Sequence, residues 1–179
     1  MKNQDLEVIT LGGGCFWCLE AIIKQLKGVE KVISGYSGGN VPGKPTYKEV
    51  CSGKTGHAEV VQVTYNPSLL KLEDLLAIFM TSHDPTTLNQ QGGDIGTQYR
   101  SVIFFHTEKQ KEIAKYVIKE LNDYFENPIV TYLRKFTEFF EAEQEHHNFY
   151  ENNPNQTYCS AVITPKLAKL REMYKDYLK

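Results

Sequence analysis

The chain is organised around one short stretch, Gly12-Gly13-Gly14-Cys15-Phe16-Trp17-Cys18-Leu19-Glu20. The apolar run before it, residues 6 to 11, predicts a short strand. Behind the glycines, apolar residues recur at helical spacing, at Phe16, Leu19, Ile22, Ile23 and Leu26. Gly28 then stands where a helix would end. The sequence therefore predicts a strand, a glycine turn and a helix whose first turn carries Cys15.

This placement bears on the chemistry of the Cys15 thiol. The start of a helix offers unpaired amides and the positive end of the helix dipole, and both favour an anion. We therefore expect the Cys15 pKa to fall below the value of about 8.5 for an ordinary thiol. The alternative is a buried cysteine behind an ordinary strand–helix turn. Trp17 beside the thiol is hard to explain by packing alone and favours a nucleophilic or redox cysteine.

The composition is that of a globular protein with one substantial core: 179 residues, of which 41% are hydrophobic. Its 20 basic and 22 acidic side chains give a net charge of −2, so the sequence lacks the positive charge typical of a nucleic-acid-binding or membrane-surface protein. No apolar signal region and no run of about 18 apolar residues is found. We expect a cytoplasmic monomer.

Four cysteines, Cys15, Cys18, Cys51 and Cys159, are expected to be reduced in that compartment. A structural zinc site would need two close pairs, and only Cys15 and Cys18 form one. Adjacent His146 and His147 point about 100° apart on a helix, so they predict a solvated helix face rather than a metal site. We expect neither a disulfide framework nor a bound metal.

Strand and helix signals alternate along the chain and predict one α/β domain over residues 1–179, with a central mixed sheet. Further strands are expected at 29–34, 57–65, 97–105 and 128–133, and helices at 66–79, 107–125, 141–150 and from Pro165 onward. Residues 157–163 fit a strand or a loop, and two-residue hairpin signals are lacking. The tail after about residue 150 is expected to wrap back over the core.

A reacting cysteine needs a proton donor or a stabiliser of negative charge. Four candidates lie on glycine-rich loops or at strand ends: Tyr47, Glu59, Asp94 and Tyr99. Each has a simpler explanation, since the tyrosines can be half-buried strand residues, Glu59 a solvated carboxylate and Asp94 a turn residue. If Glu59 is buried, however, its pKa rises and it can donate a proton near neutral pH.

Several motifs together resemble the A-type peptide methionine sulfoxide reductases. They are Gly14-Cys15-Phe16-Trp17, Thr46-Tyr47, Gly56-His57-Ala58-Glu59-Val60, His83-Asp84-Pro85 and Gly96-Thr97-Gln98-Tyr99-Arg100-Ser101. Their order and spacing match over about residues 6 to 165. The resemblance implies a ferredoxin-like α/β fold and repair of oxidised proteins by reduction of the S epimer of methionine sulfoxide, in peptides and as the free amino acid.

The resemblance also implies a role for each candidate residue. Cys15 is the nucleophile, Phe16 and Trp17 form the wall for the substrate methyl group, Tyr47, Glu59 and Tyr99 surround the sulfoxide oxygen, and Asp94 supports the pocket. Glu59 is the implied proton donor. This agrees with the chemistry, because the oxygen gains charge as sulfur is attacked and must be protonated.

Reduction leaves Cys15 as a sulfenic acid, which a second thiol can convert to a disulfide. The resemblance implies Cys159, on a mobile C-terminal segment of about residues 150–179, as this resolving cysteine. Cys18 stands where many family members have glycine, one helical turn from Cys15, and is a second candidate. We expect Cys159 to act first, with Cys18 as a relay, an alternative resolver or a bystander, and no catalytic role for Cys51. The implied partner is a dithiol reductant, thioredoxin, with no metal or organic cofactor.

Two other functions remain open at this point. A thioredoxin-like dithiol oxidoreductase would use Cys15 and Cys18 as its redox pair, but it would leave Tyr47, Glu59 and Tyr99 without a role. A binding module without catalysis would use the glycine turn and helix start to hold an anion.

Overall fold

A six-stranded sheet of order β7-β6-β1-β3-β2-β8 forms the centre of the computed structural model, which describes residues 5–179. Neighbouring strands are antiparallel except β6 and β7, which are parallel. Its strands are β1 (Glu7–Gly12), β2 (Val29–Ser37), β3 (Ala58–Tyr65), β6 (Val102–Phe105), β7 (Tyr132–Lys135) and β8 (Phe139–Glu141). The remaining two strands, β4 (Gln90–Gln91) and β5 (Asp94–Ile95), form a separate hairpin.

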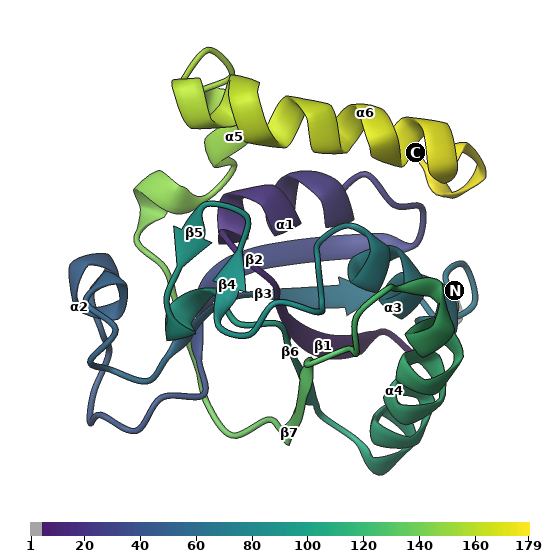
Figure 1. Ribbon diagram of the computed structural model, residues 1–179, viewed down its shortest axis with the longest axis horizontal. Coiled ribbons are helices and arrows are strands. Elements are labelled where there is room, and N and C mark those ends of the chain that lie inside the picture. The colour runs from purple at the N-terminus through teal and green to yellow at the C-terminus, as the bar shows by residue number, and fades with distance from the viewer. Residues whose placement is uncertain (1–4) are drawn as a thin grey trace.

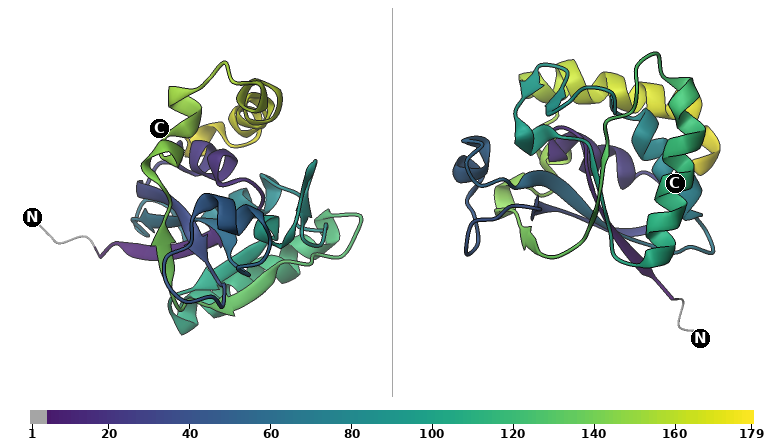
Figure 2. Two further views of the ribbon diagram at one scale, coloured as in Figure 1. Left: turned by 90° about the vertical axis from the view of Figure 1, so that its left-hand side faces the viewer. Right: turned by 60° about the horizontal axis from the view of Figure 1, so that its bottom comes forward.

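The α-helices are α1 (Phe16–Ile23), α2 (Tyr47–Cys51), α3 (Leu72–Thr81), α4 (Glu108–Leu121), α5 (Phe149–Asn152) and α6 (Thr164–Met173). Helix α1 lies on one face of the sheet, and α6 lies over α1 (Figure 1). The rotated views keep α6 on the same side of the sheet as α1 (Figure 2). Within residues 5–179, no helix has both the length and the apolar character needed to cross a bilayer.

Four of the strands and two helices form the arrangement that the resemblance implied. Helix α1 joins β1 to β2 across the intervening β3, and α3 lies on the connection from β3 to β6 across the intervening β1. Two such split βαβ units in one antiparallel sheet define the ferredoxin-like pattern. The expected mixed α/β fold with flanking helices is confirmed.

Strand β3 shows how the sequence pattern sets the core. Val61 and Val63 face the main core under α1, whereas Val60 belongs to a smaller cluster on the opposite face. Because side chains alternate along a strand, Glu59 shares the face of Val61 and Val63 and lies on the α1 side of the sheet. The strand thus carries an ionisable side chain into a fully buried position.

Several element boundaries differ from the expectation. Helix α3 begins at Leu72 rather than near Pro67, because the carbonyl of Asn66 accepts from the amides of Leu69 and Leu70 and closes a separate turn. Strand β6 begins at Val102, because residues 97–99 form a 3₁₀ turn instead of extending the strand. Strand β7 is Tyr132–Lys135, four residues later than the predicted start.

The expectation that two-residue hairpins are lacking is wrong. Gln91 and Asp94 pair across Gly92-Gly93, which form the turn of the β4–β5 hairpin. Glycine pairs suit such turns because they adopt positive φ without strain, and Gly92 has a φ of 56°. The flanking residues are polar rather than alternating apolar and polar, which is why the pattern gave no strand signal.

The C-terminal third departs furthest from prediction. The expected helix over 141–150 is instead the end of β8, a 3₁₀ turn at Gln144–His146 and the short α5, because Asn148 takes a left-handed conformation with a φ of 53°. The ambiguous segment near residue 160 is a π-helix, Cys159–Ile163, that continues into α6. The tail returns over α1 as expected (Figure 1).

Candidate active site

The glycine turn before α1 sets the position of Cys15. Cys15 is the N-cap of α1, and its carbonyl accepts from the Cys18 amide at 3.1 Å. Gly14 has a φ of 88°, and a Cβ added there would lie 2.7 Å from Cγ of Gln91. Its amide donates to the Tyr99 carbonyl at 3.2 Å, so the turn also brings Tyr99 beside Cys15. Only glycine fits this position without strain.

His83 supports the same turn from behind. Its ring nitrogens lie 2.7 Å from the Phe79 carbonyl oxygen and 2.7 Å from Ser101 Oγ. A Cβ added at Gly13 would lie 2.9 Å from the His83 ring. Burial lowers the pKa of His83 to about 4, so the ring is neutral at physiological pH and serves as packing and anchor.

The pKa of Cys15 is raised, whereas its place at the helix start predicted a lowered pKa. Burial raises the pKa of the Cys15 thiol well above its usual range, and the Cys18 side chain and the carboxyl of Glu59 raise it further. The amide of Trp17 opposes this shift only weakly. The loss of hydration therefore outweighs the helix dipole, and the free protein holds Cys15 as a neutral thiol.

Cys18 shows the opposite shift. Its pKa is lowered, chiefly by the hydrogen bond with the Cys15 side chain and then by the charge of Lys166 and the hydroxyl of Tyr158. The Tyr158 oxygen lies 3.6 Å from Cys18 Sγ. The two sulfurs thus form one hydrogen-bonded pair in which Cys18 is the more acidic member.

Glu59 is the buried acid of the site. Its side chain is fully buried, and its Oε1 accepts from the amide of Phe16 at 3.2 Å. Among residues 5–179, no hydrogen-bond partner is found for its Oε2. Burial raises the pKa of Glu59 to about 8, so the group is mostly protonated at neutral pH. The conditional expectation for this carboxyl is confirmed, and its solvated alternative is wrong.

Tyr47 and Tyr99 reach the site from two different turns. Tyr47 opens α2, and Tyr99 ends a 3₁₀ turn, so neither is the strand residue of the simpler explanation. Burial, with the neighbouring Glu59, raises the pKa of both phenols, which are therefore neutral hydrogen-bond donors. Both interact with the side chain of Cys51, which brings this cysteine closer to the site than the sequence indicated.

Phe16 and Trp17 form one aromatic wall with residues that the sequence did not identify. Phe16 stacks on Tyr47 with ring centroids 6.2 Å apart, and Trp17 stacks on Phe149 at 3.7 Å. The Trp17 indole donates to Nδ1 of His146 at 3.1 Å. His146 is only 4% exposed, so the solvated helix face expected for it is wrong.

One group near this wall has the donor types of a metal site. The ligand atoms of Glu143, Glu145 and His146 lie within 4.8 Å of one another. However, the two oxygens of Glu143 already accept from the Tyr36 hydroxyl and the Tyr47 amide, both at 2.9 Å. Glu143 thus holds the backbone of Tyr47 in place, and its carboxylate is committed to that task.

Asp94 and Tyr158 connect the site to the C-terminal segment, residues 150–179. The Tyr158 hydroxyl donates to Oδ2 of Asp94 at 2.7 Å while it also lies near Cys18. Tyr158 is not among the site residues predicted from the sequence, and its place beside Cys159 was the available signal. Cys159 itself is fully buried, and burial followed by the charge of Cys18 raises its pKa.

Cys15 borders a cavity of about 400 Å³, which we call the thiol cavity. Asp94, Tyr158 and Lys166 are among its lining residues. Of the predicted site residues, Cys15 and Asp94 line the thiol cavity. Glu59, Tyr47 and Tyr99 are not among its lining residues, but each interacts electrostatically with the Cys15 thiol. The site therefore places a buried acid and two neutral phenols near a sulfur that borders the cavity.

Comparison with known proteins agrees with this chemistry. The family model described as peptide methionine sulfoxide reductase matches residues 7–178. The chain belongs to the peptide methionine sulfoxide reductase family. It is 51% identical to peptide methionine sulfoxide reductase MsrA of Saccharolobus solfataricus, over 97% of this chain and 98% of that protein. It is 54% identical to the MsrA of Nitratiruptor, over 96% and 98% of the two chains.

Solved structures of the family share the fold. Reduced Mxr1 from Saccharomyces cerevisiae has a TM-score of 0.82 and 35% identity, covering 86% of this chain and 89% of that one. Methionine sulfoxide reductase A of Corynebacterium diphtheriae has a TM-score of 0.75 and 34% identity, covering 86% and 78%. The protein is thus an oxidoreductase that acts on methionine sulfoxide.

Proposed function

We propose that the protein reduces the S epimer of methionine sulfoxide, free or within peptides, through a sulfenic acid on Cys15. The observation that carries the proposal is the carboxyl of Glu59, which is fully buried and has one oxygen without a partner in the part of the chain that the structure describes. A protonated carboxyl with a free oxygen is suited to donate a hydrogen bond, and then a proton, to the sulfoxide oxygen.

In the first step, Cys15 sulfur attacks the sulfoxide sulfur while Glu59 protonates the oxygen. The oxygen ends on Cys15 as a sulfenic acid that carries the proton from Glu59, the thiol proton returns to the Glu59 carboxylate, and methionine leaves as the thioether. Tyr47 and Tyr99, as neutral phenols, donate hydrogen bonds to the oxygen as it gains charge. Cys15 needs no low pKa at rest, because protonation of the oxide makes the sulfur more electrophilic.

Stereoselectivity follows from the distribution of polar and apolar groups. The substrate methyl group packs against Phe16 and Trp17, and the oxygen must face Glu59. With Cys15 approaching from a third direction, only one epimer can place its remaining substituent toward the cavity opening. The family resemblance implies that this epimer is S.

For the second step, the contacts favour an order opposite to the one expected from the resemblance. The Cys18 sulfur is hydrogen-bonded to Cys15 and is the more acidic thiol, so Cys18 condenses first with the sulfenic acid and releases water. Cys159 then attacks the Cys18 sulfur, which transfers the disulfide to Cys18–Cys159 and frees Cys15. A dithiol reductant such as thioredoxin reduces that disulfide. These steps use thiols and protons alone, so no metal or organic cofactor is needed, and we propose that a cytoplasmic monomer carries them out.

A single-turnover reaction tests this proposal. Reduced protein is mixed with each epimer of N-acetyl methionine sulfoxide, methionine is quantified, and the disulfides are mapped by mass spectrometry over time. We expect one methionine per chain from the S epimer alone, with a Cys15–Cys18 bond before a Cys18–Cys159 bond. Turnover of both epimers at equal rates would overturn the assigned selectivity, and an initial Cys15–Cys159 bond would restore Cys159 as the first resolver.

A further inference from the structure

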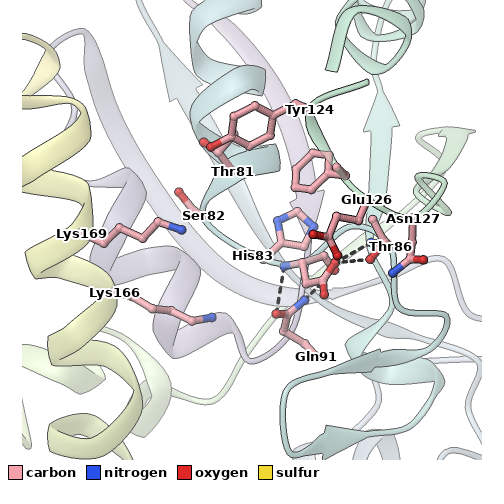
Figure 3. Close-up of a pocket in the computed structure, with 12 residues that line it drawn as sticks. Thr81, Ser82, His83, Thr86, Gln91, Tyr124, Glu126, Asn127, Lys166 and Lys169 are labelled. Atoms are coloured by element: carbon pink, nitrogen blue, oxygen red, sulfur yellow. Dashed lines mark hydrogen bonds between the residues drawn. The ribbon is translucent and has the colours of Figure 1, made fainter. Parts of the chain in front are cut away.

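A second cavity of about 450 Å³ lies beside the thiol cavity, and we call it the lysine cavity (Figure 3). The two share Gln91 and Lys166 among their lining residues, so they are adjacent. The Gln91 amide is fixed to the backbone of Asp84, with its oxygen accepting at 3.0 Å and its nitrogen donating at 2.9 Å. The wall between the two cavities is therefore held in one position.

The charged side chains that line the lysine cavity differ in whether they have partners. Lys166 and Lys169 are one turn apart on α6, and Figure 3 shows both side chains extending from the helix toward Gln91 and His83. None of the ion pairs found in residues 5–179 includes either lysine. Asp84 already accepts from the amide and hydroxyl of Thr86. No carboxylate in residues 5–179 lies within ion-pair distance of either ammonium group, although Asp84 and Glu126 also line the lysine cavity.

The length of a methionine side chain and the spacing of residues in a peptide indicate how far a substrate bound at Cys15 would extend toward the lysine cavity. Its sulfur is three bonds from Cα, so a sulfoxide at Cys15 places its own backbone roughly 4–5 Å away, at the opening of the thiol cavity. The next residue of a peptide lies about 3.3–3.6 Å further along an extended chain. Lys166 and Gln91 line both cavities, and Lys166 is the charged one of the two, at the boundary that a substrate extending from Cys15 toward the lysine cavity would pass.

We propose that Lys166 and Lys169 form a carboxylate-binding subsite that favours methionine sulfoxide with a negative charge beside it. The proposal rests on the proposed function, since it assumes that the sulfoxide binds at Cys15. Two sources supply the same chemistry: the α-carboxylate of methionine sulfoxide at a chain end, and the side chain of an adjacent Asp or Glu. An exposed lysine pair attracts either through ion pairs that salt weakens.

The test compares four substrates of the S epimer in single turnover at limiting substrate concentration. They are N-acetyl methionine sulfoxide methylamide, which is neutral, N-acetyl methionine sulfoxide with a free carboxylate, and two blocked dipeptides with Asp before or after the oxidised residue. Release of methionine is measured, because it precedes the disulfide steps in which Cys18 takes part. At low salt we expect at least one carboxylate substrate to react about threefold to tenfold faster than the neutral one, as for one or two exposed ion pairs.

Two double variants, Lys166→Ala/Lys169→Ala and Lys166→Glu/Lys169→Glu, then test whether these lysines cause the preference. The ratio of carboxylate to neutral rates should fall to about one in the first and below one in the second. The matched control is Arg171→Ala, which removes one positive charge from α6 outside the lysine cavity and should keep the wild-type ratio. A ratio is used because a general disturbance of α6 lowers all rates together.

The outcomes separate the subsite from the proposed function. A wild-type ratio near one for every carboxylate substrate, or an unchanged ratio in both double variants, would overturn the subsite while leaving reduction at Cys15 intact. No methionine from any of the four substrates would overturn the proposed function and the subsite with it. A preference for the free carboxylate alone assigns the subsite to chain ends, and a preference for an Asp dipeptide assigns it to acidic peptides.

Discussion

The two sides of the thiol cavity are built in different ways. On one side, Cys15 stands between β1 and α1, and Glu59 of β3 accepts from the amide of the next residue, Phe16; both side chains are buried within the main body of the fold. On the other side, the C-terminal segment contributes Tyr158 and Lys166 through hydroxyl and ammonium groups. The first side holds the groups that the proposed reduction needs, whereas the second packs on the main core through Cys159, Ile163, Leu167 and Leu170 and adds no strand to the six-stranded sheet.

Under the proposed function, this difference assigns the two halves of the reaction to different regions. Reduction requires a rigid arrangement of nucleophile and acid, which the sheet side supplies. Transfer of the disulfide to a fully buried Cys159 requires that residues 150–179 change position before an external reductant can reach the sulfur. The π-helix at Cys159–Ile163 lies in that segment, and such helices occur often at functional sites.

The largest effect is expected from removing the nucleophile on the rigid side. Cys15→Ser should lower methionine release in single turnover by at least about 1,000-fold, because the other thiols, Cys18 among them, do not line the thiol cavity. Cys159→Ser on the C-terminal side should still release one methionine per chain and then stall. Equal loss in both variants would contradict the division of the reaction between the two regions.

Replacing the buried acid is expected to have the next largest effect. Glu59→Gln should slow sulfoxide reduction by about 100- to 1,000-fold, within the range for loss of a general acid. Because the pKa of Glu59 is about 8, the wild-type rate should fall as the pH rises through 8, where the carboxyl loses its proton. The variant should lack this fall. Near-UV circular dichroism checks that it remains folded, and a wild-type rate in a folded variant would remove Glu59 from the acid role.

The two candidate resolving cysteines give a smaller, kinetic difference. Cys18→Ser should slow formation of the first disulfide by roughly tenfold or more, because its sulfur is already hydrogen-bonded to Cys15 whereas Cys159 must first move. Cys159→Ser should accumulate a Cys15–Cys18 disulfide. Quenched samples mapped by mass spectrometry report both. Formation of a Cys15–Cys159 bond at the wild-type rate in Cys18→Ser would make Cys18 a bystander.

The smallest effect concerns the contact that joins the two sides. Tyr158→Phe removes the hydroxyl that donates to Asp94 and should lower the free energy of unfolding by about 1–2 kcal/mol, measured by urea titration. Hydrogen exchange should rise mainly within residues 150–179. The matched control is Tyr150→Phe, whose hydroxyl lies 2.8 Å from Thr164 within the same segment and away from Asp94. Equal exchange in the two variants would show that the Tyr158 contact does not hold the segment closed.

Much of the fold was readable from the sequence because its signals are local. Glycines followed by a helical apolar pattern predicted the β1–α1 turn, and alternation in residues 58–65 predicted β3. The β4–β5 hairpin, the late start of α3 and the π-helix were missed or misplaced. Each depends on turns and contacts whose partners are polar or distant in sequence, so the periodicity of apolar residues does not predict them.

The sequence by itself determined which residue types stand at the candidate site, namely Cys15, Glu59, Tyr47, Tyr99 and Asp94, and which family contains that combination. Tertiary structure alone decided how these groups are protonated. The position at the helix start predicted an acidic Cys15, yet burial raises its pKa and leaves Cys18 as the more acidic thiol. Hydration is lost only when distant segments close over a group, as Tyr158 does over Cys18 from 140 residues away. The pKa of such a group depends on its burial by these segments, and that burial cannot be read from the local sequence.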